Sequence, residues 1–60
     1  MDLLTLKEAA NRLGIAPQTL MNWRSRDYGP PWAHIGGRVR YKPEDIDRWI
    51  NDRFKENTNG

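Results

Sequence analysis

The sequence predicts a small, mostly α-helical domain that carries one β-hairpin, and three observations support this prediction. Residues 6–13 and 17–26 each place apolar side chains at the helical spacing of three and four. A Gly-Gly pair lies between β-prone residues, as at the tip of a tight hairpin. From Pro43 the chain continues with two acids, a pattern typical of a helix start. Sixty residues have room for one domain with a small core.

Charge is distributed unevenly along the chain. Ten lysines and arginines against eight acids give a net charge of +2. Six of the basic residues and only one acid, Asp27, lie between Arg12 and Lys42, whereas residues 44–56 contain five acids. This asymmetry favours one side that faces a polyanion and another that faces solvent. A scattered charged surface is the alternative.

Composition also excludes several classes of site. The chain has no cysteine, so it has neither disulfides nor thiolate ligands, and one histidine does not make a zinc site. We expect no metal, no cofactor and no small-molecule ligand. The acids after Pro43 suit a helix start, have no nucleophile beside them, and so predict a protein that is not an enzyme. Because no leader or membrane-span pattern occurs, we expect no membrane association and a location in the cytoplasm of a bacterial or phage-infected cell.

The first helix is predicted from its cap and its stop. Thr5 and Glu8 have the spacing of a capping box, which places the helix start near Leu6. Gly14 is expected to end the helix in the left-handed conformation.

A second helix is predicted from Pro17 to Arg26. Proline suits the first helical position, although Ala16 is a poor N-cap before it. The spacing of apolar residues up to Trp23 is typical of a helix-turn-helix, whose second helix enters a major groove of DNA. An ordinary corner between two helices is the alternative.

The hairpin is expected to have a three-residue loop. With a two-residue loop, Ile35 would share a face with Arg38 and Arg40 and stay exposed. Pairing Ile35 with Val39 instead gathers the apolar residues on one face, which favours the odd loop length.

The third helix is expected to present an apolar stripe, and a polar tail follows it. We place the folded domain in residues 1–54 and predict that residues 55–60 are a disordered polar tail. The predicted core consists of Leu6, Ala10, Leu13, Ile15, Leu20, Trp23, Val39, Tyr41, Ile46, Trp49 and Ile50.

Five blocks follow one another from Leu4 to Ile50: Leu4-Thr5-Leu6-Lys7-Glu8-Ala9-Ala10, Leu13-Gly14-Ile15, Pro17-Gln18-Thr19-Leu20 with Trp23-Arg24, Ile35-Gly36-Gly37-Arg38-Val39-Arg40-Tyr41, and Glu44-Asp45-Ile46-Asp47-Arg48-Trp49-Ile50. Together they resemble the excisionase family of DNA-binding domains, which are relatives of the MerR-type winged helix. The resemblance implies a winged helix-turn-helix with two N-terminal helices, a two-stranded wing and a third helix. It also implies a role in binding double-stranded DNA.

The resemblance further implies that the second helix faces the major groove through Gln18, Thr19, Asn22 and Arg24. Amide side chains read adenine through paired hydrogen bonds, so we assign base contacts to Gln18 and Asn22. Thr19 and Arg24 are expected to contact phosphates. Met21 either touches a thymine methyl group or covers the core edge. Exposed polar residues of an ordinary surface helix are the alternative.

The wing is expected to bind DNA through Arg38 and Arg40. Both would contact phosphates, and Arg38, nearest the tip, would enter the adjacent minor groove, whose negative potential attracts a guanidinium. His34 is expected to be a surface or packing residue. Weaker candidates for phosphate contacts are Arg12, Arg26 and Lys42.

Three roles remain open at this point. The first is an excisionase, or recombination directionality factor, of a phage or mobile element. Such a protein binds cooperatively with neighbouring copies of itself, bends DNA and promotes excision, with a site-specific integrase as a further partner. The second role is a small transcriptional regulator of the same fold, and the third is a protein-interaction module that touches DNA little.

Overall fold

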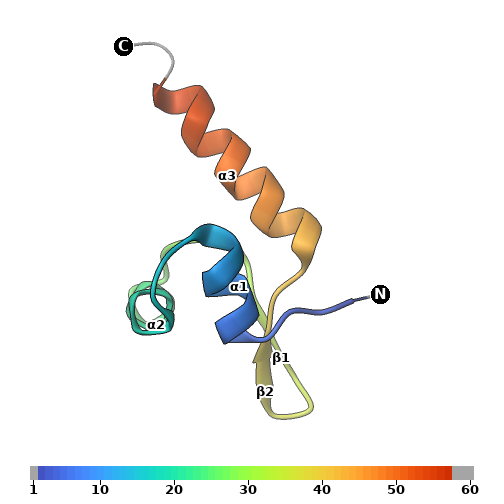
Figure 1. Ribbon diagram of the computed structural model, residues 1–60. Coiled ribbons are helices and arrows are strands. Elements are labelled where there is room, and N and C mark those ends of the chain that lie inside the picture. The colour runs from blue at the N-terminus through green and yellow to red at the C-terminus, as the bar shows by residue number, and fades with distance from the viewer. Residues whose placement is uncertain (1, 58–60) are drawn as a thin grey trace.

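Residues 2–57 are described by the computed structural model, and they form three α-helices and one two-stranded antiparallel sheet (Figure 1). This mostly helical arrangement with a hairpin wing confirms the predicted fold class. In chain order the elements are α1 (Leu6–Leu13), α2 (Pro17–Ser25), β1 (Ala33–Ile35), β2 (Arg38–Arg40) and α3 (Pro43–Asn57).

Both ends of α1 follow the local rules read from the sequence. The backbone amide of Glu8 donates to Thr5 Oγ1 at 3.1 Å, and the amide of Thr5 donates to Glu8 Oε1 at 2.8 Å, which confirms the capping box. Gly14 has φ of +75° and ends the helix in the left-handed region. The amide of Ile15 then donates to the carbonyl of Ala10 at 3.0 Å, which turns the chain sharply toward α2.

The second helix begins at Pro17, as predicted, and ends one residue earlier than predicted. Ala16 provides no side-chain cap, in keeping with its weak capping chemistry. At the other end, Asp27 has a positive φ of 57°, so helical geometry stops there. The amide of Tyr28 donates to the carbonyl of Trp23 at 2.9 Å and satisfies one of the last carbonyls of α2.

The hairpin has a two-residue loop, and the expected three-residue loop is wrong. Ile35 pairs with Arg38, and His34 pairs with Val39. The loop is the Gly36-Gly37 pair, with φ of +62° and +83°, values that suit a type I′ turn. Ile35 therefore lies on the face of the arginines and keeps 52% of its surface exposed. The turn geometry that two glycines favour has prevailed over burial of one isoleucine.

A short N-terminal segment extends the sheet by one pairing. Leu4 and Tyr41 form an antiparallel bridge, in which each backbone amide donates to the other residue's carbonyl, at 2.8 and 2.9 Å. This pairing holds the entrance to α1 against the end of β2. The base of the wing is thereby attached to the helical body.

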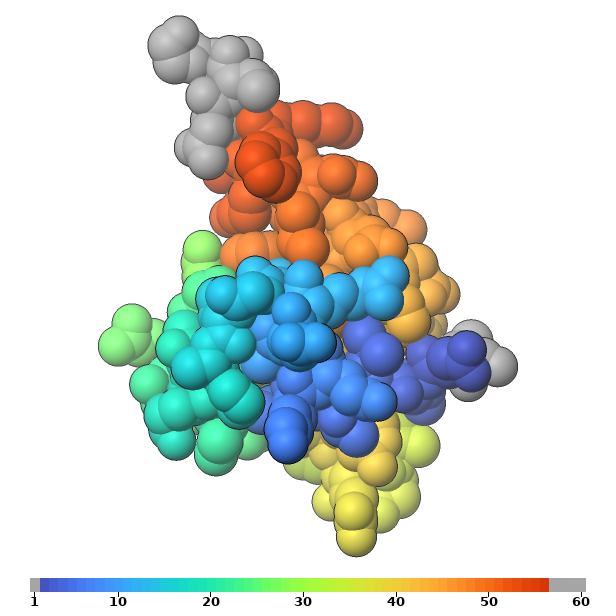
Figure 2. All heavy atoms as spheres, in the orientation of Figure 1, coloured from blue at the N-terminus to red at the C-terminus, as the bar shows by residue number. Residues whose placement is uncertain are grey.

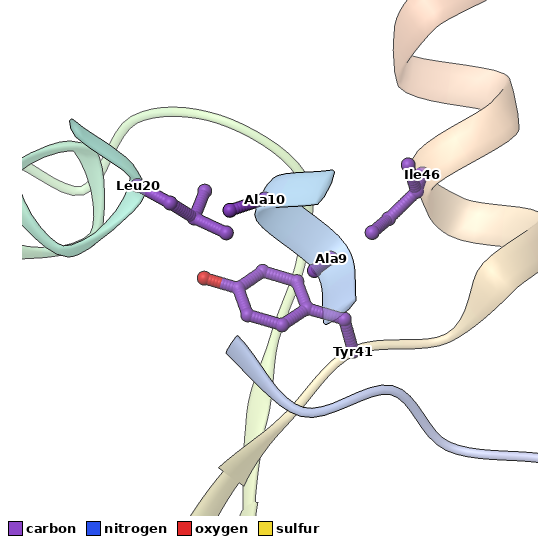
Figure 3. Close-up of a cluster of buried hydrophobic side chains, with 5 residues drawn as sticks. All are labelled: Ala9, Ala10, Leu20, Tyr41 and Ile46. Atoms are coloured by element: carbon purple, nitrogen blue, oxygen red, sulfur yellow. The ribbon is translucent and has the colours of Figure 1, made fainter. Parts of the chain in front are cut away.

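The core lies between α1 and the elements on either side of it (Figure 3). Four predicted core residues, Ala10, Leu20, Tyr41 and Ile46, are fully buried, and Ala9 joins them. Two buried alanines allow neighbouring elements to approach α1 closely. The predicted core residues that are half-buried against this cluster are Leu6, Leu13, Ile15, Trp23, Val39 and Ile50.

Trp49 lies outside the buried core, in an aromatic cluster that contacts the core through Trp23. Its ring centroid lies 5.4 Å from that of Trp23 and 5.8 Å from that of Tyr28, and the Trp23 and Tyr28 rings are 5.1 Å apart. These three rings join α2 and the loop after it to α3. Aromatic pairs at such separations add stability beyond the area they bury.

The third helix is longer than predicted and projects from the body of the molecule (Figures 1 and 2). It continues through residues 55–57, where the sequence predicts a disordered tail, and Arg53 forms an ion pair with Glu56 across this last turn. Pairs at this spacing add modest support to a helix end. The remaining tail residues, 58–60, lie outside the described residues. Among residues 2–57, none of the helices has the length and apolar character that crossing a membrane requires.

Candidate nucleic-acid interface

One face of α2 is polar and open to solvent. Its exposed side chains Gln18, Met21, Asn22 and Ser25 lie at the spacing of three, four and seven that makes one helical face. Gln18 Nε2 donates to Asn22 Oδ1 at 3.3 Å, so the two amides lie side by side one turn apart. This face has donors and acceptors that match the edges of base pairs.

Two sequence-predicted residues of α2 lie at the borders of this face. Thr19 and Arg24 are both half-buried, whereas Gln18 and Asn22 are exposed. The guanidinium carbon of Arg24 lies 5.3 Å from the ring centroid of Trp32, just before β1. Arg24 Nε is buried and, among the described residues, has no hydrogen-bond partner. Arg24 therefore joins α2 to the base of the hairpin.

The two faces of the hairpin differ in character. Arg38 and Arg40 lie on one face together with Ile35. The ring of Trp32 belongs to the other face, because it contacts His34 at 5.2 Å. This second face is turned toward α2, since Arg24 lies on the same ring.

The two wing arginines differ in exposure and in bonding. Arg38 is exposed and follows the turn directly. Arg40 is half-buried, and its Nη1 donates to the carbonyl of Val39 at 2.8 Å. Arg38 is thus the freer of the two guanidinium groups.

The weaker phosphate candidates lie in different environments. Arg12 is engaged by Asp47 of α3, with Nε to Oδ1 at 3.2 Å and Nη2 to Oδ2 at 3.3 Å. This bidentate pair holds α1 against α3 and occupies the guanidinium. Arg26 is exposed at the end of α2, and Lys42 is exposed just before α3.

Among the described residues, the pKa values of Glu8 and Tyr41 are shifted, and both side chains support the fold rather than the exposed face of α2. The backbone amide of Thr5, together with its hydroxyl, holds the pKa of Glu8 below its ordinary value. Burial raises the pKa of the Tyr41 hydroxyl, and the positive charge of Arg24 opposes this rise. Within residues 2–57 we find no cluster of histidine and carboxylate side chains that could hold a metal ion.

Ser25 and His34 are interface candidates that the sequence reading did not select. Ser25 lies seven residues after Gln18, so helical periodicity places it on the same face. Its hydroxyl donates to the carbonyl of Met21 at 3.2 Å. His34 lies on the hairpin face that is turned toward α2. This placement follows from the two-residue loop and could not be derived from the three-residue loop that the sequence predicts. Met21 is 40% exposed, which favours a place on the surface of α2 over a place in the core.

Comparison with known proteins identifies the family to which the chain belongs. The chain matches the family model described as a helix-turn-helix domain over residues 3–53. No curated protein and no solved structure matches the chain. The matched range contains α1, α2, the hairpin and most of α3. The chain therefore belongs to the helix-turn-helix domain family and is a DNA-binding protein of that fold.

Proposed function

We propose that this protein is a sequence-specific, double-stranded DNA-binding architectural factor that serves as an excisionase of a phage or mobile element. The observation that carries the proposal is the ordered set of blocks from Leu4 to Ile50, which resembles the excisionase family. Its blocks coincide with the two helices, the hairpin and the start of α3. In this role the protein binds beside a recombination site and promotes excision by a site-specific integrase.

Recognition of bases is assigned to the exposed face of α2. Gln18 and Asn22 enter the major groove, where each amide donates to and accepts from the edge of an adenine. In the free protein the two amides bond to each other at 3.3 Å, which orients both toward the same side. On DNA this bond exchanges for bonds to bases. Thr19 and Arg24, at the borders of the face, bind phosphates.

The wing arginines are assigned to the DNA backbone. Arg38 directly follows the turn and is exposed, so it reaches the adjacent minor groove. Arg40 binds a phosphate nearer the base of the wing. Arg26 and Lys42 remain weaker candidates, and Arg12 is the weakest because Asp47 occupies its guanidinium.

Small size supports cooperative binding. A single module of this kind buries roughly 600–1,000 Å² of its surface on DNA, which limits affinity and specificity. Neighbouring copies on adjacent sites add affinity when they contact one another. Copies bound in this way hold the DNA in a bent path, which brings the sites of recombination together.

A mobility-shift titration tests this role. The protein is added to DNA that flanks its own coding sequence, and circularly permuted fragments report bending. An excisionase should give a ladder of successive cooperative complexes whose mobility depends on the position of the site. One discrete, unbent complex at a promoter would instead indicate a small transcriptional regulator. Absence of any complex at low salt would indicate a protein-interaction module.

A matched pair of variants assigns the signal to α2. Asn22→Ala removes an amide from the exposed face of α2, and Asn51→Ala removes one from an exposed position of α3. The proposal expects weaker complexes for Asn22→Ala and an unchanged ladder for Asn51→Ala. Equal effects of the two substitutions would contradict the assignment of α2.

A further inference from the structure

His34 and Arg24 meet on one aromatic ring, although they come from different elements. The imidazole of His34 lies 5.2 Å from the ring of Trp32, at an interplanar angle of 82°. The guanidinium of Arg24 lies 5.3 Å from the centroid of the same residue's ring. Trp32 therefore contacts one permanent cation from α2 and one titratable base from β1.

The hairpin register explains why His34 faces α2. A two-residue loop places His34 opposite Val39 and on the side of Trp32, while Arg38 and Arg40 lie on the reverse side. His34 is exposed, and within residues 2–57 its imidazole makes neither a hydrogen bond nor an ion pair. Its two ring nitrogens are thus free to bind a ligand that lies between α2 and the wing.

Nucleic acid bound by α2 and the wing together passes this position. A duplex that receives α2 in one groove and the wing tip in the next presents a backbone strand between them. We infer that His34 and Arg24, held on the ring of Trp32, form one site for a DNA backbone phosphate, and that His34 binds it as the imidazolium. This inference rests on the proposed DNA-binding mode of α2.

Protonation of His34 is expected to be coupled to DNA binding. A phosphate bound beside an imidazole favours its protonated form. An ordinary histidine titrates near pH 6.5, so the coupling falls in an accessible range. Arg24 of α2 lies on the ring of Trp32 and near the Tyr41 hydroxyl, while Arg40, Lys42 and Asp45 line a pocket together with Trp32. Arg38 and Arg40 extend from the other face of the hairpin.

Fluorescence anisotropy with a labelled, mixed-sequence duplex of about 20 base pairs tests the site, since phosphate contacts do not require a particular sequence. Measurements at low salt compare about pH 7.5 with about pH 5.5, on either side of an ordinary histidine pKa. We expect the wild-type protein to bind about fivefold more tightly at the lower pH, because a phosphate favours the imidazolium form. His34→Gln should bind equally at both pH values. His34→Arg should bind at both as the wild type does at the lower pH.

The outcomes separate this inference from the proposal on which it rests. Wild-type binding that is equal at both pH values, or a pH dependence that persists in His34→Gln, would overturn the phosphate site and leave DNA binding intact. Failure of the wild-type protein to bind at either pH would overturn DNA binding itself. His34 is the only histidine in the chain, so its imidazole NMR signals report its pKa directly, and that pKa should rise when the duplex is added.

Discussion

The guanidinium of Arg24 lies over the ring of Trp32, 5.3 Å from its centroid, and this contact joins α2 to the base of the wing. An arginine over an indole ring is attracted to the negative face of its π system. Because Arg24 Nε is buried beside this contact, the side chain has little freedom to move away. The separation between α2 and the wing is therefore set before DNA arrives, which lowers the entropy lost on binding.

Removing the indole should weaken DNA binding more than folding. Trp32→Leu keeps an apolar side chain but loses the cation–π contact, and we expect a loss of about 1 kcal/mol in binding, or roughly fivefold in the dissociation constant. Trp32→Phe keeps an aromatic face and should bind nearly as the wild type does. Anisotropy titrations at constant salt measure the affinities, and circular dichroism verifies the fold. Wild-type affinity for Trp32→Leu would contradict a positioning role for this ring.

The contact that we propose for Arg38 should appear in the salt dependence of binding. Each phosphate that is neutralised adds about 0.9 to the slope of log affinity against log salt, so Arg38→Ala should lower the slope by about one. The matched control is Arg48→Ala on α3, because this arginine is 73% exposed and pairs only loosely with Asp45. Its slope should equal that of the wild type. An unchanged slope for Arg38→Ala would exclude the phosphate contact.

The turn of the hairpin should tolerate asparagine better than alanine. Gly37 has φ of +83° and open space around it, so Gly37→Ala introduces backbone strain and no clash. We expect a loss of about 1–2 kcal/mol in the free energy of unfolding, measured by urea denaturation. Gly36→Asn should leave stability nearly unchanged, because asparagine favours the first central position of a type I′ turn. Equal stability of the wild type, Gly37→Ala and Gly36→Asn would indicate that the hairpin does not have a type I′ turn.

Acid should weaken the capping box of α1. Hydrogen bonds from Thr5 lower the pKa of Glu8 in the folded protein, so the folded state binds this proton less readily than the unfolded chain does. The stabilising contribution is complete above the ordinary carboxyl pKa and is lost as pH falls through the lowered value. In urea denaturation, the stability of the wild type relative to Glu8→Gln should therefore be greater at about pH 6 than at about pH 3. Parallel curves over this range would contradict the shift.

Features that depend on a few neighbouring residues could be predicted from the sequence. The capping box at Thr5, the left-handed Gly14 and the uncapped start of α2 at Ala16 all follow from local chemistry, and all are confirmed. The register of the hairpin is a different case, because burial of Ile35 and the geometry of the Gly-Gly turn favour opposite answers. Sequence alone did not show which preference is stronger.

Contacts between segments that are distant in the sequence could not be predicted from local sequence patterns. Arg12 and Asp47 are 35 positions apart, and nothing local marks them as partners. The same holds for Trp32, whose position under Arg24 depends on the whole path of the loop after α2. The side chains of the exposed face of α2 could be predicted in large part, because periodicity alone separates them from Leu20.

The most direct test of DNA binding through α2 is chemical-shift mapping by NMR, in which ¹⁵N-labelled protein is titrated with a duplex that it binds. If α2 enters the major groove and the wing contacts the backbone, the largest amide shifts fall on α2, from Gln18 to Ser25, and on the hairpin tip around Arg38. Amides on the exposed face of α3, such as those of Asn51 and Asp52, should shift little. Shifts confined to α3, or no shifts on α2 at saturating DNA, would contradict DNA binding through α2.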